Sequence, residues 1–274
     1  MPEAPEVETI RQTLLPSIRG QTISDIRQSR KHLRTRFETS AFRFLQGQTI
    51  ERLQRQGKML WIETSQKGGF IVRLGMSGQF LLTAKQKRKA PHTHVVFSLG
   101  NDHQLRFVDP RRFGEVVPFL QNDELNRHRR ALGPDVLEVL SQEPRSFITE
   151  RLKRTTRAIK DVLLDQTVIA GLGNIYVCEV LFLARISPFR TANSLQNKQI
   201  DRILKYTVEV NEQAMANGGT TLSDYRDGHG EPGRHQHHLL VFQRPQEPCP
   251  RCRTPIRREY FRGRSTFFCA RCQP

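Results

Sequence analysis

The sequence lacks a long hydrophobic run. Its most apolar stretch, residues 168–184, contains Asn174 and Glu179, so it predicts a buried helix and not a membrane-spanning one. The N-terminus is acidic and interrupted by prolines, whereas a secretory signal begins with basic residues followed by an apolar segment. The chain also has no internal repeat. We therefore expect a globular protein with neither a secretory signal nor a membrane span.

Acidic residues are scarce relative to basic ones. The 274 residues include 44 Lys and Arg against 27 Asp and Glu, which gives a formal net charge of +17 at pH 7. A surplus of this size predicts a polyanionic partner, most simply nucleic acid. A membrane surface is a weaker alternative, because no amphipathic basic helix stands out. The length leaves room for two domains, each with its own core.

Cysteine is scarce as well, and four of the five cysteines lie in one C-terminal cluster. Cys249 and Cys252 are followed, after sixteen residues, by Cys269 and Cys272. Two thiolate pairs at this spacing predict one zinc ion in a tetrahedral site, which would be structural because no ligand position stays open. Disulfides are the alternative. Cys178, in the apolar stretch, is expected to be a buried thiol.

The first half of the chain shows the alternation that is typical of short strands. We expect strands at residues 22–26, 49–53, 59–63, 70–74, 80–82, 94–99, 105–108 and 115–119. Eight strands in about a hundred residues predict a two-layered β-sandwich. An N-terminal helix should pack beside it, because Val7, Ile10 and Leu14 recur at helical spacing after Pro5. Pro16 is expected to end that helix.

The second half is predicted to be helical. Helices are expected at residues 146–154, 156–165, 174–184 and 194–217. Gly218 and Gly219 would cap the last of these helices at its C-terminus. The polar residues 220–238, rich in Gly and His, are expected to form a mobile loop without a core. Residues 256–261 and 265–268 predict a hairpin within the cysteine cluster, with its turn at residues 262–264.

These elements predict an α+β fold in four parts. They are a helix with a β-sandwich (residues 1–125), a charged connector (126–145), a helical domain with the polar loop (146–240) and a zinc-binding β-hairpin (241–274).

The N-terminus itself offers a nucleophile. If Met1 is removed, Pro2 carries a free secondary amine, and an α-amino group has a pKa of about 7.7–8.0. Part of it is therefore unprotonated at neutral pH and able to attack an electrophilic carbon. Glu3 lies one peptide bond away, where it could move protons for that amine. The alternative is that these residues are an ordinary chain start before a helix. The helix that begins at Pro5 argues against this alternative, because the positive potential at its N-terminus favours a neutral amine at Pro2.

Five motifs together resemble the formamidopyrimidine-DNA glycosylase family of bacterial base-excision repair enzymes. They are residues 2–9 (PEAPEVET), 74–78 (LGMSG), 109–114 (DPRRFG), 171–176 (GLGNIY) and the cysteine hairpin. The resemblance implies a bifunctional DNA glycosylase and lyase that removes oxidised purines, chiefly 8-oxoguanine and formamidopyrimidines, from duplex DNA. It also implies a helix–two-turns–helix element in the helical domain, and a lesion-recognition loop at residues 220–238.

The resemblance further implies which residues act. Pro2 would attack C1′ and form a Schiff base, and Glu3 would transfer protons, before β,δ-elimination cleaves the strand. The implied catalytic residues are Pro2, Glu3, Lys58 and Arg264, the last two as phosphate contacts. The implied DNA-binding residues are His92, Arg111, Lys160, Asn174, Met76 and Phe113.

For some of these residues an ordinary structural role remains open. By the resemblance, Met76 and Phe113 would fill the space that the extruded base vacates, and Arg111 beside them would contact the orphaned partner base. The alternative for Met76 and Phe113 is ordinary packing in the core. His92, together with His94 at strand spacing, could instead be structural. Position 73, which often holds His in the family, is Arg73 here, so it could add a phosphate contact or shift the ionisation of its neighbours.

The implied partner is damaged double-stranded DNA, bound by a monomer in the bacterial cytoplasm in association with the nucleoid. Two alternatives remain open. The first is an oxidised-pyrimidine glycosylase of the endonuclease VIII type. The second is a zinc-stabilised DNA-binding protein without catalysis, which would follow if Met1 were retained.

Overall fold

Two compact units make up the chain. The computed structural model describes all residues except 1, 30, 36, 37 and 67, so the processing of Met1 lies outside the described residues. The first unit contains Met1–Ala131 and Asn217–Gln236, and the second contains Leu132–Ala216 and His237–Pro274. The sequence analysis grouped residues 217–236 with the helical domain by their place in the chain, whereas their contacts group them with the first unit. Each unit is described by itself.

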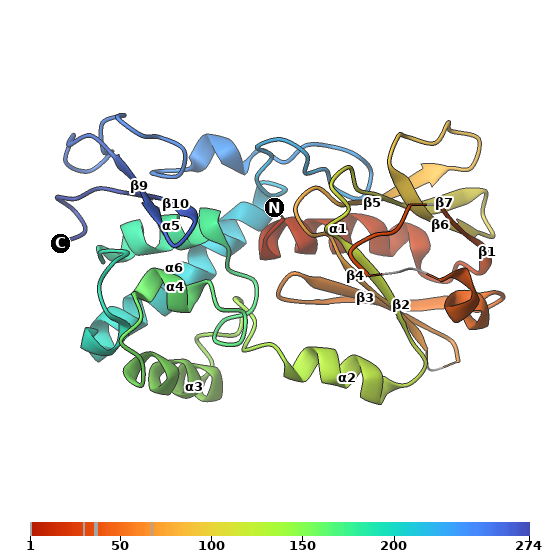
Figure 1. Cartoon of the computed structure of the whole chain (residues 1–274), viewed down its shortest axis with the longest axis horizontal. Coiled ribbons are helices and arrows are strands. Elements are labelled where there is room, and N and C mark those ends of the chain that lie inside the picture. Colours follow the sequence, from red (N-terminus) through yellow and green to blue (C-terminus); the bar gives the residue numbers. More distant parts are fainter. Residues whose placement is uncertain (1, 30, 36–37, 67) are drawn as a thin grey trace. The chain divides into compact units, whose positions relative to one another are not determined.

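Two antiparallel four-stranded sheets form the first unit (Figure 1). One has the order β1-β6-β7-β5 and the other β2-β3-β4-β8. Their strands are β1 (Ile23–Gln28), β2 (Ile50–Gln56), β3 (Met59–Thr64), β4 (Gly69–Arg73), β5 (Gln79–Ala84), β6 (Thr93–Leu99), β7 (His103–Val108) and β8 (Glu115–Phe119). All eight predicted strands and the two-layered sandwich are confirmed.

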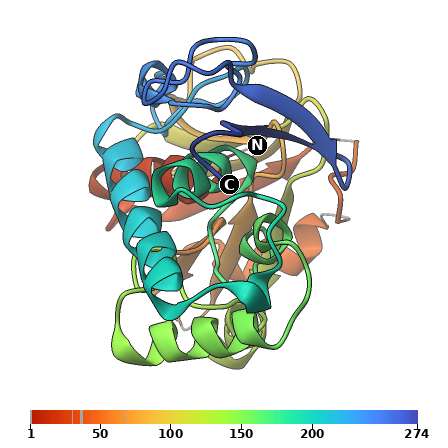
Figure 2. The ribbon, with the colours of Figure 1, turned by 90° about the vertical axis from the view of Figure 1, so that its left-hand side faces the viewer.

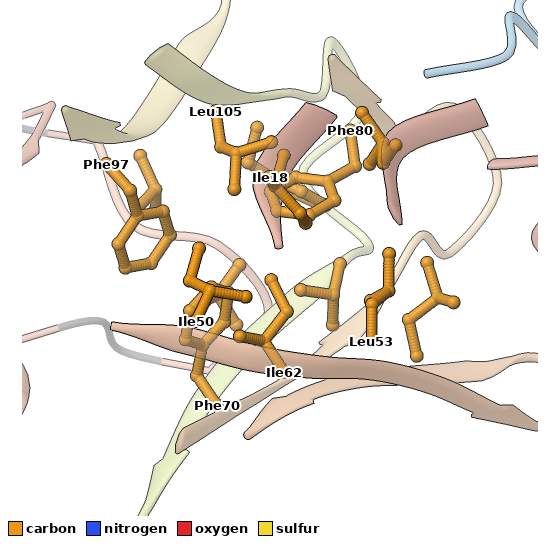
Figure 3. Packing of buried hydrophobic residues seen from close by; sticks show 14 of the residues in the cluster. Ile18, Ile50, Leu53, Ile62, Phe70, Phe80, Phe97 and Leu105 are labelled. Carbon is orange, nitrogen blue, oxygen red and sulfur yellow. The ribbon is translucent and has the colours of Figure 1, made fainter. Parts of the chain in front are cut away.

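The core of this unit lies between the two sheets. Figure 3 shows Phe80, Phe97 and Leu105 pointing from one sheet towards residues of the other, which include Phe70. The rings of Phe70 and Phe97 stack across the layers with centroids 4.3 Å apart and planes at 10°. Such offset aromatic pairs add stability beyond the burial of their area. A 3₁₀ helix, η1 (Thr39–Leu45), also contributes buried side chains to this core.

The N-terminal helix α1 (Ala4–Ile18) packs against both sheets. Its apolar face buries Ile10, Leu14 and Ile18 completely. The prediction that Pro16 ends the helix was wrong, because α1 continues through it to Ile18. A proline in the last turn removes one hydrogen bond, and the burial of Ile18 offsets that loss.

The 217–236 segment is packed, contrary to the expectation of a loop without a core. Tyr225 is 6 % exposed and belongs to the core cluster of the first unit. The backbone of Gly228 lies between α1 and β5: its N–H donates to the Thr13 hydroxyl (3.0 Å), and its carbonyl accepts from the Leu82 N–H (2.8 Å). Composition showed that the segment is polar, but it did not show that one tyrosine and two backbone groups anchor it.

A helix also occupies the predicted connector. This helix, α2 (Asn122–Arg130), belongs to the first unit and buries only Leu125. Its first turn holds Asp123 and Glu124 and its last turn is basic, which is the charge arrangement that a helix dipole favours. Charge placement thus supports a helix in a stretch whose overall composition indicated a connector.

Four helices and a hairpin form the second unit (Figure 2). The helices are α3 (Gln142–Lys153), α4 (Ile159–Leu163), α5 (Asn174–Ala184) and α6 (Asn197–Ala216), and short 3₁₀ turns lie at Ala192–Ser194 and His235–His238. The bounds predicted for α5 are confirmed. The helix predicted at residues 156–165 is shorter, because Ala158 forms a β-bridge with Thr191. The described helices include none that is long and apolar enough to cross a membrane.

The buried carboxylate of Glu179, on α5, holds a segment of the chain that comes after α6. Both oxygens of Glu179 accept backbone N–H groups, from Leu240 (2.8 Å), Val241 (3.0 Å) and Phe242 (2.8 Å). This accounts for an acidic residue in the most apolar stretch of the sequence, since a buried carboxylate must be hydrogen-bonded. The charge that interrupts the apolar run therefore fixes the entry to the C-terminal hairpin.

The C-terminal hairpin consists of β9 (Arg257–Phe261) and β10 (Arg264–Phe268) and packs against α5. Its two-residue turn places Arg262 at φ 45° and Gly263 at φ 74°. Positive φ at both positions is the geometry of a type I′ turn, which matches the twist of paired strands. The hairpin predicted from the sequence is confirmed.

Candidate active site and nucleic-acid interface

The N-terminus is held firmly at the start of α1. Pro2 and Glu3 are both buried, and Glu3 is only 2 % exposed. Glu3 and Glu6 form a capping box, in which the Glu3 N–H donates to Glu6 Oε2 at 2.7 Å. Capping boxes satisfy the free N–H groups of a helix N-terminus reciprocally. The backbone nitrogen of Pro2 therefore lies beside a capped and acidic helix end.

Glu6 also binds the 217–236 segment, a role that the sequence analysis missed. Its Oε1 accepts the backbone N–H of Thr220 at 2.7 Å. The Tyr225 hydroxyl donates to the carbonyls of Glu6 (3.3 Å) and Gly218 (3.1 Å). Burial, and then the charge of Glu6, raise the pKa of Tyr225, so it remains a donor. One buried glutamate thus holds both the backbone of Glu3 and the start of this segment.

Lys58 lies in the two-residue turn between β2 and β3. It is half-buried and follows Gly57, which adopts φ 57°. Arg55 supports this turn by donating to the Gly57 carbonyl (2.9 Å) and to Glu8 Oε2 on α1 (3.0 Å). Burial would raise the pKa of Glu8, but hydrogen bonds and charges from Arg11 and Arg55 lower it below its ordinary value. The turn that carries Lys58 is therefore tied to the N-terminal helix by an ion pair.

Met76 and Phe113 are exposed at neighbouring turns. Their exposed fractions are 41 % and 47 %, which excludes the alternative that they are core residues. The guanidinium of Arg111 lies over the Phe113 ring at 5.0 Å. Gly75 adopts φ 64°, and a Cβ there would come within 2.6 Å of the Phe113 backbone, so the two turns touch through their main chains. An apolar pair and a cation are thus presented to solvent together.

A buried aspartate, which the sequence analysis also missed, joins these turns. Asp109 is fully buried; its Oδ1 accepts from the Ser77 hydroxyl (2.6 Å) and its Oδ2 from the Gly114 N–H (2.8 Å). The Asp109 carbonyl contacts His94 Nε2 at 3.0 Å. Burial lowers the pKa of His94, consistent with a neutral structural imidazole. His92 is exposed, at φ 62°, and its carbonyl accepts the Asp109 N–H (3.0 Å).

Arg73 is engaged within the first unit. Its Nη1 donates to Glu115 Oε2 at 3.2 Å, and its Nη2 contacts His128 Nδ1 at 3.2 Å. Burial, and then the charge of Arg73, lower the pKa of His128. Arg73 was expected either to contact a phosphate or to shift the ionisation of its neighbours. Its effect on the pKa of His128 agrees with the second role.

In the second unit, three predicted site residues meet at the hairpin. Lys160 is 1 % exposed, and its Nζ donates to the Ser265 carbonyl (3.1 Å) and to the Thr266 hydroxyl (2.7 Å). Asn174 Nδ2 donates to the same Ser265 carbonyl at 2.9 Å. Arg264, next to Ser265, is exposed at the turn. Burial lowers the pKa of Lys160, whose ammonium is occupied inside the unit.

A cavity of about 540 Å³ opens beside this meeting point. Asn174, Arg258 and Arg264 line it, together with Phe242 and Phe267. Asn174 stands at the N-terminus of α5, where the helix dipole favours an anion. Two arginines and a helix N-terminus make this cavity suited to a phosphate group.

The four clustered cysteines fit one zinc ion. Their sulfurs lie within 4.8 Å of one another, with Cys249 to Cys272 at 3.9 Å and Cys252 to Cys269 at 3.5 Å. Zn–S bonds of about 2.3 Å in a tetrahedron would place the sulfurs about 3.8 Å apart. Burial, and then the other three cysteines, raise the pKa of Cys272 to about 12, a cost that a bound cation would relieve.

All five cysteines are free thiols, so the disulfide alternative is not what the structure contains. The fifth, Cys178, is buried on α5 as expected.

Three family models match the chain. They describe the formamidopyrimidine-DNA glycosylase N-terminal domain (residues 1–116), the formamidopyrimidine-DNA glycosylase H2TH domain (132–226) and the zinc finger found in FPG and IleRS (246–274). The chain is 42 % identical to the formamidopyrimidine-DNA glycosylase of Geobacillus kaustophilus over 278 residues, with full coverage of both. It is 42 % identical to that of Moorella thermoacetica over 260 residues, covering 94 % of each.

Solved structures agree with these matches. The MutM (Fpg) protein of Thermus thermophilus superposes with a TM-score of 0.86 at 37 % identity, covering 99 % of this chain and 98 % of that one. The Lactococcus lactis Fpg bound to DNA containing an abasic site gives a TM-score of 0.89 at 33 % identity and 99 % coverage of both.

Proposed function

The chain belongs to the formamidopyrimidine-DNA glycosylase family, and from this premise we propose that its own Pro2 and Glu3 carry the reaction. The protein is a DNA glycosylase and lyase of base-excision repair that acts on oxidised purines in duplex DNA. The observation that supports Pro2 and Glu3 is their burial at the capped N-terminus of α1, where the Glu3–Glu6 capping box holds the backbone of Glu3, the residue after Pro2.

In the proposed reaction the Pro2 nitrogen attacks C1′ of the damaged nucleotide. A bond forms between this nitrogen and C1′ as the bond from C1′ to the base breaks, and the base leaves with a proton. Opening of the sugar gives an iminium ion, an electron sink that acidifies the C2′ proton. Loss of that proton expels the 3′ phosphate by β-elimination. Loss of a second proton, from C4′, then expels the 5′ phosphate by δ-elimination. Glu3, one residue away, supplies and removes the protons at the sugar.

The damaged base must leave the duplex before Pro2 can reach the sugar. We assign Met76 and Phe113 to the vacated space, because both are exposed and apolar. Arg111 lies over Phe113, so it can donate to the unpaired partner base. Asp109 and Ser77 hold the two turns in register.

Phosphate contacts would come from both units. We assign Lys58 and His92 in the first unit, and Asn174 and Arg264 in the second, to the DNA backbone. Phosphate contacts fix the position of a protein on the duplex without reading its sequence. Lys160 supports them from within, since its buried ammonium holds the hairpin next to Arg264.

One structural zinc, held by Cys249, Cys252, Cys269 and Cys272, stabilises the hairpin; its chemistry is to cross-link the four thiolates. We also propose that the protein acts as a monomer in the bacterial cytoplasm, associated with the nucleoid. Along the chain we propose four functional parts, residues 1–125, 126–145, 146–240 and 241–274; within the third part, residues 217–236 pack with the first unit.

Borohydride trapping tests this assignment. With a duplex that contains one 8-oxoguanine opposite cytosine, the protein should give a covalent adduct that maps to Pro2. Pro2→Gly should cripple base release, and Glu3→Gln should remove it while DNA binding persists. Pro5→Ala is the matched control, because Pro5 lies in the same helix turn without the free amine.

An adduct at any other residue would contradict the role of Pro2, and near-normal rates in Glu3→Gln would contradict that of Glu3. Faster release of thymine glycol than of 8-oxoguanine would contradict the lesion class.

A further inference from the structure

A second basic cavity lies in the second unit, at the opposite end of α5 from Asn174. Its volume is about 680 Å³, and five arginines line it: Arg185, Arg190, Arg202, Arg251 and Arg271. The other lining residues are Gln199, Cys252, Cys272 and Pro274. We call these five arginines the arginine basin. It shares no lining residue with the cavity beside Asn174 and Arg264.

Two of the five arginines have structural hydrogen bonds. Arg251 donates to the carbonyls of Phe182 (2.8 Å) and Leu183 (3.3 Å), which cap the C-terminus of α5. Arg190 donates to the hydroxyl of Ser194 at 3.2 Å. These contacts account for the positions of Arg251 and Arg190, but they neutralise no charge, because every acceptor is uncharged.

The other three arginines are Arg185, Arg202 and Arg271, and all are exposed. Among the described residues, none of the five basin arginines forms an ion pair with a carboxylate within 4.0 Å. Elsewhere in this unit arginines do find acids, as Arg145 does with Asp201 at 2.7 Å. Five converging cations with no Asp or Glu among the lining residues repel one another unless an anion lies among them.

The neighbouring zinc site could account for part of this charge. Zn²⁺ with four thiolates carries a net charge of −2, and Cys252 and Cys272 line the basin. Five arginines exceed that charge, so a positive surplus remains for a further anion. The test below therefore includes zinc content, which would change if the arginines served only to balance the thiolates.

The lining residues also indicate the class of anion. Guanidinium groups bind phosphate oxygens in bidentate pairs. The described lining residues include no aromatic ring on which a base could stack. This composition suits backbone phosphates, which carry charge at regular intervals, better than a free nucleotide, whose base would have no partner.

From these observations we propose that the arginine basin binds the backbone phosphates of a second DNA segment, separate from the segment held near Asn174 and Arg264. Asn174 and Arg185 are eleven residues apart, at the two ends of α5. A helix rises about 1.5 Å per residue, so the two basic cavities are separated by roughly 16 Å along its axis. Binding at the basin would allow one chain to hold two duplexes.

The experiment counts short undamaged duplexes bound per chain by native mass spectrometry at low salt, with zinc-loaded protein. The test variant combines Arg185→Asn and Arg202→Gln. Asparagine suits the left-handed conformation of residue 185 (φ 57°), and glutamine is a good helix former on α6. The control variant, Arg151→Gln with Arg154→Gln, removes the same charge from two exposed arginines, one in the last turn of α3 and one at its C-cap, that line neither cavity.

We expect two duplexes for the wild type and the control variant, and one for the test variant, with one zinc per chain in all three. In the test variant, the affinity for the second duplex should fall at least about tenfold. The slope of log K against log salt for that duplex should become shallower by about 2, because each lost phosphate contact accounts for about 0.9.

A single duplex on the wild type, or two on the test variant, would overturn the proposal. Zinc loss from the folded test variant would instead assign the arginines to the metal site. We expect tripolyphosphate to displace the second duplex. If tripolyphosphate binds to the arginine basin but no second duplex does, the ligand is a small anion and the assignment to DNA is overturned. None of these outcomes depends on base release, so they are distinguishable from a failure of the proposed catalytic residues.

Discussion

Replacing Glu6 by glutamine removes one of two carboxylate oxygens that hold the N-terminus. In the wild type, Oε2 accepts the Glu3 N–H and Oε1 accepts the Thr220 N–H, each at 2.7 Å. A glutamine side chain keeps one acceptor oxygen and turns an NH₂ group towards the other donor. One buried N–H then loses its partner, whichever way the amide is oriented.

The size of the effect follows from this loss. A hydrogen bond to a charged group contributes about 1.5–3 kcal/mol, and an unsatisfied buried donor costs a similar amount. We expect the local stability around Glu3 and Thr220 to fall by about 2 kcal/mol. Since 1.4 kcal/mol corresponds to a factor of ten, hydrogen exchange at the amide that loses its acceptor should accelerate roughly 30-fold.

Hydrogen exchange read by NMR measures this directly, and single-turnover base release measures its consequence. Because Glu3 is placed by its backbone, we expect base release to slow by more than about tenfold while DNA affinity stays near the wild-type value. Glu51→Gln is the control, since Glu51 is an exposed glutamate on β2. Unchanged exchange at both amides in Glu6→Gln would refute the reasoning, whatever the activity.

Three further predictions follow from other contacts. A chelator should release about one zinc per chain and abolish DNA binding, and metal-free protein that still binds would contradict the role of the hairpin. The pKa of Glu8 is lowered in the folded protein, so its contribution to stability is present above its unfolded pKa and is lost as pH falls through the lowered value. The urea midpoint of Glu8→Gln should therefore approach that of the wild type below about pH 4, and a constant gap would oppose this. Phe113→Ala should slow base release about tenfold with little loss of stability, because Phe113 is exposed; Leu120→Ala, also exposed, is its control.

The parts of the fold that the sequence predicted well depend on local patterns. Eight strands follow from alternation and turn residues, and the bounds of α5 follow from Gly173 before it and an apolar run within it. The cysteine spacing likewise determines the hairpin, since both pairs must reach one ion. These features need only neighbours in sequence, so no knowledge of the tertiary structure was required.

The features that were missed depend on partners far along the chain. Glu6 and Thr220 are 214 positions apart, and no local pattern indicates that they meet. Tyr225 lies in a polar stretch, but its hydroxyl is satisfied by Glu6 and Gly218, which permits its ring to join the core. Composition correctly predicts that most of that stretch is polar, but it does not predict that Tyr225 is buried in the core.

Lys160 shows how far a motif alone can specify a role. The resemblance implies a phosphate contact, but the Lys160 ammonium is buried and donates to Ser265 and Thr266 of the hairpin. If it acts by holding the hairpin, Lys160→Met should weaken DNA binding and zinc retention without changing the slope of log K against log salt. Arg264→Gln should instead reduce that slope by about 0.9, as expected for one lost phosphate contact. A slope that falls equally in both variants would show that Lys160 leaves its buried partners to bind DNA directly.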